Sequence, residues 1–254
     1  MIVKSEAIVL RSMKYRDTSR IVTFYTRAFG KIGGIVRGAR SAKNSLGAAL
    51  QPMSHVGLVL YKKEGRELHS VTQCDLLTPF RALGEDLPRM AAGMAIIELV
   101  ANIAHEEEEN PALFELLLSS LSGANASAGD PAEHFFRFEV LLAGILGFKP
   151  VFDQCVSCGK QVPNTAAEIR FELDRGGPLC SNCTDRHGHT VTLSGRQLHY
   201  LASLDGRTGP GARGLEPSSK TEIERFLETF LRKHVSGIRT SKSERVFSRL
   251  LMEP

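Results

Sequence analysis

The sequence predicts an α+β protein of more than one domain, with an N-terminal β-barrel, a helical domain after it, and a cysteine-rich insertion within the helices. Three observations lead to this prediction. Short runs of β-branched and aromatic residues fill the first 80 residues. The apolar pattern changes to a helical period after Pro79, and two Cys-x-x-Cys pairs interrupt the helical part. At 254 residues, the chain is long enough for two or three domains.

The first 80 residues divide into predicted strands at 6–12, 20–26, 31–36, 55–62 and 67–74. Turn-forming residues separate the strands, as at Gly30-Lys31. Five short strands in this length favour a five-stranded barrel of the OB-fold, which often binds single-stranded nucleic acid. We expect residues 38–52 to form a long basic loop that contains a short helix.

Helices are expected from residue 88 to 104 and from 111 to 121, followed by a small-residue linker over 122–130. Asp130-Pro131 opens a third helix, with an N-cap and a proline at the first helical position. Two later helices are predicted to begin at the caps Ser194 and Ser219. The domain boundaries that we expect are 1–80 for the barrel, 81–254 for the helical domain and 153–189 for the insertion.

Four cysteines have the spacing of a metal site: Cys155, Cys158, Cys180 and Cys183. Two residues between partners let one tight turn aim both thiolates at one point, and two such turns make a tetrahedral sulfur cage suited to one structural Zn²⁺. Two disulfides or four unrelated thiols would be the alternative, but nothing else in the sequence indicates a secreted protein. His187 and His189 follow closely, and we expect them to be exposed loop residues. Cys74 is predicted to be a small buried residue.

The charge is unevenly distributed along the chain. Residues 1–80 hold 13 lysines and arginines against 5 acidic residues, whereas residues 81–150 hold 4 against 11. A basic small domain is the electrostatic feature expected of nucleic-acid binding. The acidic run Glu106–Glu109 is interpreted as a solvated helix end and turn.

Basic residues in the predicted barrel loops are the candidate nucleic-acid contacts. They are Arg37, Arg40 and Lys43 after the third strand, Lys14 and Arg16 after the first, and Lys62 and Lys63 after the fourth. Proteins that bind single-stranded nucleic acid typically combine cations that follow its phosphate backbone with aromatic rings that stack on its bases. These basic residues, together with aromatic residues such as Tyr61, form such a mixture.

Several other classes of protein are disfavoured. The sequence has no GxxxxGK[ST] phosphate loop, no GxSxG elbow and no HExxH pair. A zinc deaminase would need Pro directly before a Cys-x-x-Cys pair, but Leu179 separates Pro178 from Cys180. The longest apolar segment, from Met90 to Ala104, is interrupted by Glu98 and does not predict a membrane span. We therefore expect a cytoplasmic binding protein without catalytic residues.

Taken together in their order, these residues resemble the bacterial recombination mediator family RecO. The resemblance rests on Ala7–Leu10, Arg20–Thr26, Arg37–Arg40, the two cysteine pairs and the basic end Ser241–Ser243. It implies an OB-fold, a helical domain with a zinc finger, and no enzymatic turnover. It also implies binding to single- and double-stranded DNA and annealing of complementary strands. Together with RecR, such a protein would help to load RecA onto strands coated by single-strand-binding protein (SSB). The helical domain would bind the acidic C-terminal tail of SSB. An RNA-binding OB-fold protein with a structural zinc is the alternative.

Overall fold

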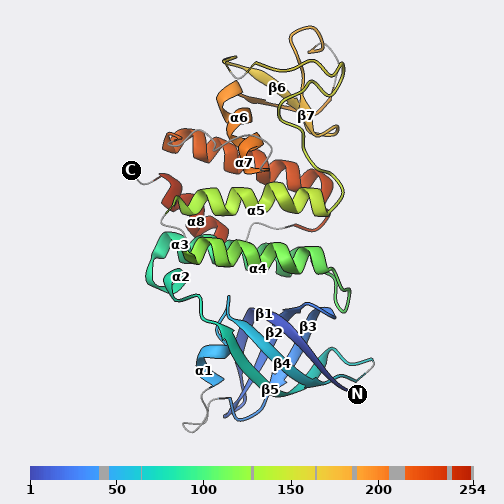
Figure 1. The fold of residues 1–254 in the computed structure, drawn as a ribbon, viewed down its shortest axis with the longest axis vertical. Helices are drawn as coiled ribbons and strands as arrows, with labels where there is room; N and C mark the ends of the chain where they lie inside the picture. Colours follow the sequence, from blue (N-terminus) through green and yellow to red (C-terminus); the bar gives the residue numbers. More distant parts are fainter. Residues whose placement is uncertain are drawn as a thin grey trace. The chain divides into compact units, whose positions relative to one another are not determined.

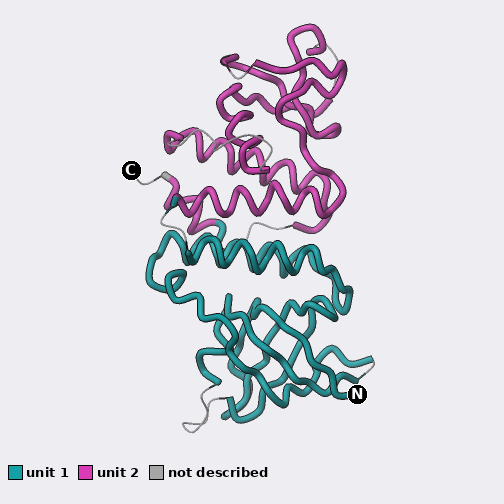
Figure 2. Tube along the Cα trace, in the orientation of Figure 1, with its two compact units in different colours: residues 1–129, 239–244 teal, residues 130–238, 245–254 magenta. Residues whose placement is uncertain are grey.

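The computed structural model describes residues 1–39, 46–63, 65–126, 129–163, 165–184, 188–205, 215–238 and 242–252 (Figure 1). The chain forms two compact units (Figure 2). The first unit contains residues 1–129 and 239–244, and the second contains residues 130–238 and 245–254. None of the described helices is both long enough and apolar enough to span a membrane.

The first unit begins with five strands that close into a barrel. They are β1 (Ile2–Tyr15), β2 (Ser19–Thr26), β3 (Gly30–Val36), β4 (His55–Tyr61) and β5 (Leu68–Thr78), with the short helix α1 (Leu46–Ala49) between β3 and β4. The strand order is β1-β2-β3-β5-β4, and β1 pairs with β4 to close the ring. All neighbours are antiparallel except β3 and β5. This topology confirms the predicted OB-type barrel.

Side chains along the strands alternate between the barrel interior and its outer surface, and the inward-facing ones form the core. On β2 and β3, for example, Val22, Phe24, Ile32 and Val36 are buried in the interior, and intervening residues such as Thr23 and Ile35 are more exposed. Cys74 belongs to the same core, and burial raises the pKa of its thiol to about 12. The prediction that Cys74 is a buried structural residue is therefore confirmed.

The helices of the first unit follow the barrel. They are α2 (Arg81–Glu85), α3 (Leu87–Ile103) and α4 (Pro111–Ala126). The Asp86 side chain caps α3 by accepting a hydrogen bond from the Arg89 backbone N–H at 2.9 Å. The predicted linker over 122–130 is partly wrong, because α4 continues to Ala126. Leu121 and Ala124 are buried, so apolar contacts support this last turn despite its small residues.

The second unit packs helices around a phenylalanine-rich core. Its helices are α5 (Pro131–Ile145), α6 (Gly195–Leu204) and α7 (Pro217–His234), and α8 (Lys242–Met252) supplies residues to both units. Asp130 caps α5, and Ser194 with Gln197 forms a capping box on α6, as the sequence predicts. Ser219 is not the N-cap of α7, because Pro217 already occupies the first helical position.

The cysteine-rich module contains a three-stranded sheet in the order β7-β6-β8. The strands are β6 (Ile169–Glu172), β7 (Gly177–Pro178) and β8 (Thr190–Leu193). Phe171 of β6 packs edge-on against Phe226 of α7, with ring centroids 4.8 Å apart. Lys233 Nζ of α7 pairs with Asp174 at 2.7 Å, so apolar and ionic contacts both attach the module to this helix.

Candidate metal centre and nucleic-acid interface

The structure brings the four predicted ligand cysteines together. The sulfur atoms of Cys155, Cys158, Cys180 and Cys183 all lie within 4.8 Å of one another. The Sγ atoms of Cys158 and Cys180 are 3.6 Å apart. A tetrahedral shell with Zn–S bonds of about 2.3 Å places sulfurs about 3.8 Å apart, so the cage has the size that such an ion requires.

Two tight turns build the cage. The backbone N–H of Gly159 donates to the Cys155 carbonyl at 2.8 Å, and that of Cys183 donates to the Cys180 carbonyl at 2.8 Å. Gly159 has φ +74°, a left-handed conformation that glycine adopts without the penalty of a Cβ atom. The sequence therefore folds each Cys-x-x-Cys pair into a knuckle whose two thiols face the same point.

The environment of Cys155 favours its thiolate form. Burial opposes ionisation, but backbone N–H groups of Cys180, Ser157 and Cys158 favour the anion and together lower the pKa of the Cys155 thiol to about 6. Four protein thiolates can hold one metal ion, and they would fill its tetrahedral shell, which is the pattern of a structural site. His189 is not part of this group: its side chain is 76% exposed and lies beside Asp174. His187 lies outside the described residues.

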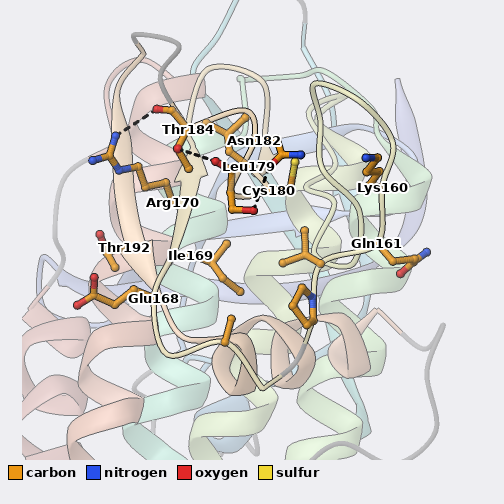
Figure 3. A pocket seen from close by; sticks show the side chains of 14 residues that line it. Lys160, Gln161, Glu168, Ile169, Arg170, Leu179, Cys180, Asn182, Thr184 and Thr192 are labelled. Carbon is orange, nitrogen blue, oxygen red and sulfur yellow. Dashed lines mark hydrogen bonds between the residues drawn. The ribbon is translucent and has the colours of Figure 1, made fainter.

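A surface pocket of about 530 Å³ adjoins the second knuckle, and Cys180 contributes to its wall (Figure 3). Arg170 spans one side and donates a hydrogen bond from Nη1 to the Thr184 carbonyl at 3.2 Å. Lys160 lies on the other side of the pocket from Arg170 and Glu168 (Figure 3). The pocket is a hollow in the surface of the metal module, and its charged groups do not converge on one point.

Four basic residues meet at one end of the barrel. Strand register places Lys14 of β1 opposite Arg20 of β2, and Arg20 opposite Val36 of β3. Arg16 lies in the turn between β1 and β2, and Arg37 follows β3 directly. We call Lys14, Arg16, Arg20 and Arg37 the basic row. Lys14, Arg16 and Arg37 are exposed, and Arg20 is half-buried.

Arg20 is a member of the row that sequence reasoning missed, because it lies inside a strand rather than in a loop. Its guanidinium donates to Ser12 Oγ at 2.8 Å, which fixes its direction on the barrel surface. Lys14 also lies in a strand, since β1 extends to Tyr15, and the prediction of a loop there is wrong. Arg40 and Lys43 fall outside the described residues.

Lys62 and Lys63 lie away from the basic row. They follow β4 beside the beginning of β1, where Ile2 pairs with Tyr61, whereas the row lies at the other end of β1. Lys63 is exposed, but Lys62 Nζ pairs with Glu107 at 2.7 Å. The run Glu106–Glu109 is exposed and lies in a turn, as the sequence predicts, but it also contacts the barrel through Lys31 and Lys62.

The fold and sites define a class of protein: a closed OB-type barrel with exposed basic residues, followed in the same chain by helices and a cluster of four cysteines that could hold a metal ion. The profile "Recombination protein O N terminal" matches residues 1–80, and "Recombination protein O C terminal" matches residues 84–244. The chain therefore belongs to the recombination protein O family.

Relatives support this assignment over nearly the full length. The chain is 31% identical to the DNA repair protein RecO of Chloroherpeton thalassium, covering 99% of this chain and 100% of the relative. It is 34% identical to the DNA repair protein RecO of Symbiobacterium thermophilum, with 89% of each chain covered. The DNA repair protein RecO of Bacillus pumilus is 33% identical, over 91% of this chain and 88% of the relative.

Proposed function

We propose that this protein is a DNA-binding recombination mediator of DNA repair. It binds single- and double-stranded DNA and anneals complementary strands. With RecR, it helps to load RecA onto single strands coated by SSB. Membership of the recombination protein O family and the names of the relatives support the repair role. The observation that carries the DNA-binding part is the basic row, which strand register assembles from β1, β2 and the residue after β3.

The proposed contacts act on the sugar–phosphate backbone. Each phosphate that Lys14, Arg16, Arg20 or Arg37 neutralises releases counterions, and for single strands each contact adds about −0.7 to the log–log salt slope. Lys63 extends the proposed contact set, as do Arg40 and Lys43, which lie between β3 and α1 in the sequence. Lys62 belongs to it once its ion pair with Glu107 opens.

Backbone contacts of this kind suit an annealing protein. Two strands must approach each other against phosphate repulsion while their bases stay free to pair. In the β1–β2 turn, the Arg16 guanidinium lies 5.2 Å from the centre of the Tyr15 ring. That ring face is therefore covered by a cation, and the turn presents charge to the nucleic acid rather than an open surface for stacking a base.

The cysteine cage is proposed to hold one structural Zn²⁺ through Cys155, Cys158, Cys180 and Cys183. The ion would link the two knuckles and contribute folding free energy, because it binds the folded arrangement of thiolates and not the unfolded chain. A filled shell leaves no position for a substrate, which supports a binding protein rather than an enzyme. We propose that residues 1–80 serve DNA binding and that the helical domain, residues 81–254 with the zinc finger at 153–189, receives the acidic SSB tail. The proposed location is the cytoplasm, at the nucleoid.

A strand-annealing assay tests the proposal. Complementary oligonucleotides, one carrying a fluorophore and the other a quencher, are mixed with and without the protein, and the assay is repeated with SSB-coated strands. We expect faster annealing of DNA in both formats. Equal rates with and without protein would remove the mediator role, and acceleration confined to RNA strands would favour the RNA-binding alternative.

A further inference from the structure

The acidic loop Glu106–Glu109, between α3 and α4, is attached to the barrel through its backbone. The Glu107 N–H donates to the Lys31 carbonyl at 2.9 Å, and Glu106 forms an isolated parallel bridge with Lys31. At Gly30, an added Cβ would lie 1.9 Å from the Glu108 carbonyl oxygen, so only glycine allows the loop to approach so closely. The main chain therefore fixes the loop against β3 independently of its charges.

The Glu107 side chain joins two groups of the barrel. One carboxylate oxygen lies 2.7 Å from Lys62 Nζ, and the other lies 3.0 Å from His69 Nε2. His69 is buried, with 2% of its surface exposed, and its Nδ1 is 3.5 Å from the Lys63 backbone nitrogen. The hydrogen bond from Lys62 is the main cause of the lowered pKa of Glu107. Glu107 is thus an ionised carboxylate that bridges Lys62 and the buried His69.

Lys62 already has two partners within the unit. Besides Glu107, its ammonium lies 5.8 Å from the centre of the Phe29 ring, and its side chain is 20% exposed. Its neighbour Lys63 is exposed and has no ion pair within the described part of the chain. Two adjacent lysines in one loop therefore differ in how readily they can meet a phosphate.

We propose that Glu107 competes internally with nucleic-acid phosphate for Lys62, and so determines that Lys63 is the lysine of this loop that contacts DNA. A carboxylate and a phosphate offer an ammonium the same kind of charge-assisted hydrogen bond, and the Glu107 carboxylate, 2.7 Å from Lys62 Nζ, also repels a phosphate that approaches this lysine. The backbone contacts of the loop keep the Glu107 carboxylate close to Lys62, whereas DNA loses translational and rotational entropy when it binds. Lys62 therefore enters the binding surface only when its pair with Glu107 opens. This inference rests on the proposed DNA-binding function.

A double-mutant cycle between Glu107 and Lys62 tests the competition. In Glu107→Gln, the amide oxygen still accepts a hydrogen bond from His69, but Lys62 no longer has a carboxylate partner and its ammonium can bind a phosphate. We expect Glu107→Gln to bind a single-stranded oligonucleotide about three- to tenfold more tightly at low salt, with a log–log salt slope steeper by about 0.7. Lys62→Ala alone should change affinity less than about twofold, since the lysine is occupied, but it should abolish the gain when combined with Glu107→Gln.

Glu109→Gln is the matched control. Glu109 is an exposed member of the same loop, and its removal changes the net charge by the same amount. An equal gain in Glu109→Gln and Glu107→Gln would overturn the proposal, because it would show an effect of total charge. A loss in Lys62→Ala as large as in Lys63→Ala would also overturn it.

Glu107→Asp keeps the charge and shortens the side chain. It should also bind more tightly, which covers the case in which Glu107→Gln folds poorly; thermal melting of each variant is measured alongside. Different results would refute the proposed function and this inference. If the wild-type protein does not bind single-stranded DNA, the proposed function is lost. If the wild-type protein binds and neither Glu107 variant gains affinity, only the competition is refuted.

Discussion

Lys14 and Arg20 occupy directly opposite positions on the antiparallel strands β1 and β2. Like charges directly opposite each other on neighbouring strands destabilise a sheet. Arg16 in the adjoining turn and Arg37 after β3 extend the pair, so that among the described residues four basic side chains lie at this end of the barrel, with the acidic Asp17 in the same turn. A phosphate backbone bound along this end would relieve the repulsion, which is consistent with the proposed role of the basic row in binding nucleic acid.

Arg37→Ala combined with Arg40→Ala should weaken binding to single-stranded DNA and flatten its salt dependence by about 1.4 in log–log slope, because two phosphate contacts are lost. Arg37 is exposed, so the substitution should leave stability nearly unchanged. Fluorescence anisotropy at several salt concentrations measures both quantities. Unchanged affinity at low salt would place the contacts elsewhere.

Cys155→Ser should abolish the proposed metal binding and lower the melting temperature far more than it changes intrinsic DNA affinity. The substitution breaks a cage in the second unit, whereas the basic row lies in the first. Metal content by a colorimetric zinc assay, thermal melting and DNA affinity below the melting point are measured together. Cys74→Ala is the control, since Cys74 lies in the barrel core and should leave one zinc per chain. A Cys155→Ser protein that melts normally but no longer binds DNA would show that the site acts in recognition.

Acid should destabilise the first unit through two carboxylates. The hydrogen bond from Arg27 lowers the pKa of Glu6, and that from Lys62 lowers the pKa of Glu107. A carboxyl group whose pKa is lower in the folded than in the unfolded state stabilises the fold at pH values above its unfolded pKa, and this contribution is lost as the pH falls through the folded pKa. The loss should therefore begin below about pH 4.5.

Urea unfolding at intervals between pH 6 and pH 3 measures this effect. The double variant Glu6→Gln/Glu107→Gln should be less stable than the wild type at pH 6 and should lose less stability on acidification. A double variant whose stability falls with pH as steeply as that of the wild type would assign acid sensitivity to other groups.

Gly30→Ala should destabilise the first unit by more than about 1–2 kcal/mol. That amount is the cost of a left-handed conformation for a residue with a Cβ atom, and Gly30 has φ +62°. The collision with the Glu108 carbonyl adds to it and should displace the acidic loop. Gly84→Ala, in α2, is the control, since an added Cβ there meets nothing within 4 Å and should be neutral or slightly stabilising. Equal melting temperatures for the two variants would contradict the close approach of the loop to Gly30.

The local features of this protein could be predicted from its sequence. Runs of β-branched and aromatic residues between turn signals predicted five strands that the barrel confirms, and Cys-x-x-Cys spacing predicted a cage whose sulfurs lie within 4.8 Å of one another. Both signals are short-range, because a strand or a knuckle is specified by residues close together in the chain.

The parts that were missed depend on contacts between distant residues. Lys62 and Glu107 are 45 positions apart, and no periodicity indicates that a run of glutamates will be held against a barrel. Arg20 reads as an ordinary strand residue, and only the register of β1 with β2 places it beside Lys14. The end of α4 was misjudged because small residues predict a linker, whereas burial of Ala124 favours the helix.

The salt dependence of single-strand binding by Lys14→Ala/Arg20→Ala tests the central claim most directly. Its control is Lys4→Ala/Arg81→Ala, which removes two exposed charges of the first unit outside the row. We predict that the row variant weakens binding and reduces the log–log slope by about 1.4 relative to this control, while thermal melting shows that both variants are folded at the assay temperature. Identical slopes and affinities for the two variants would contradict the assignment of the basic row as the DNA-binding surface.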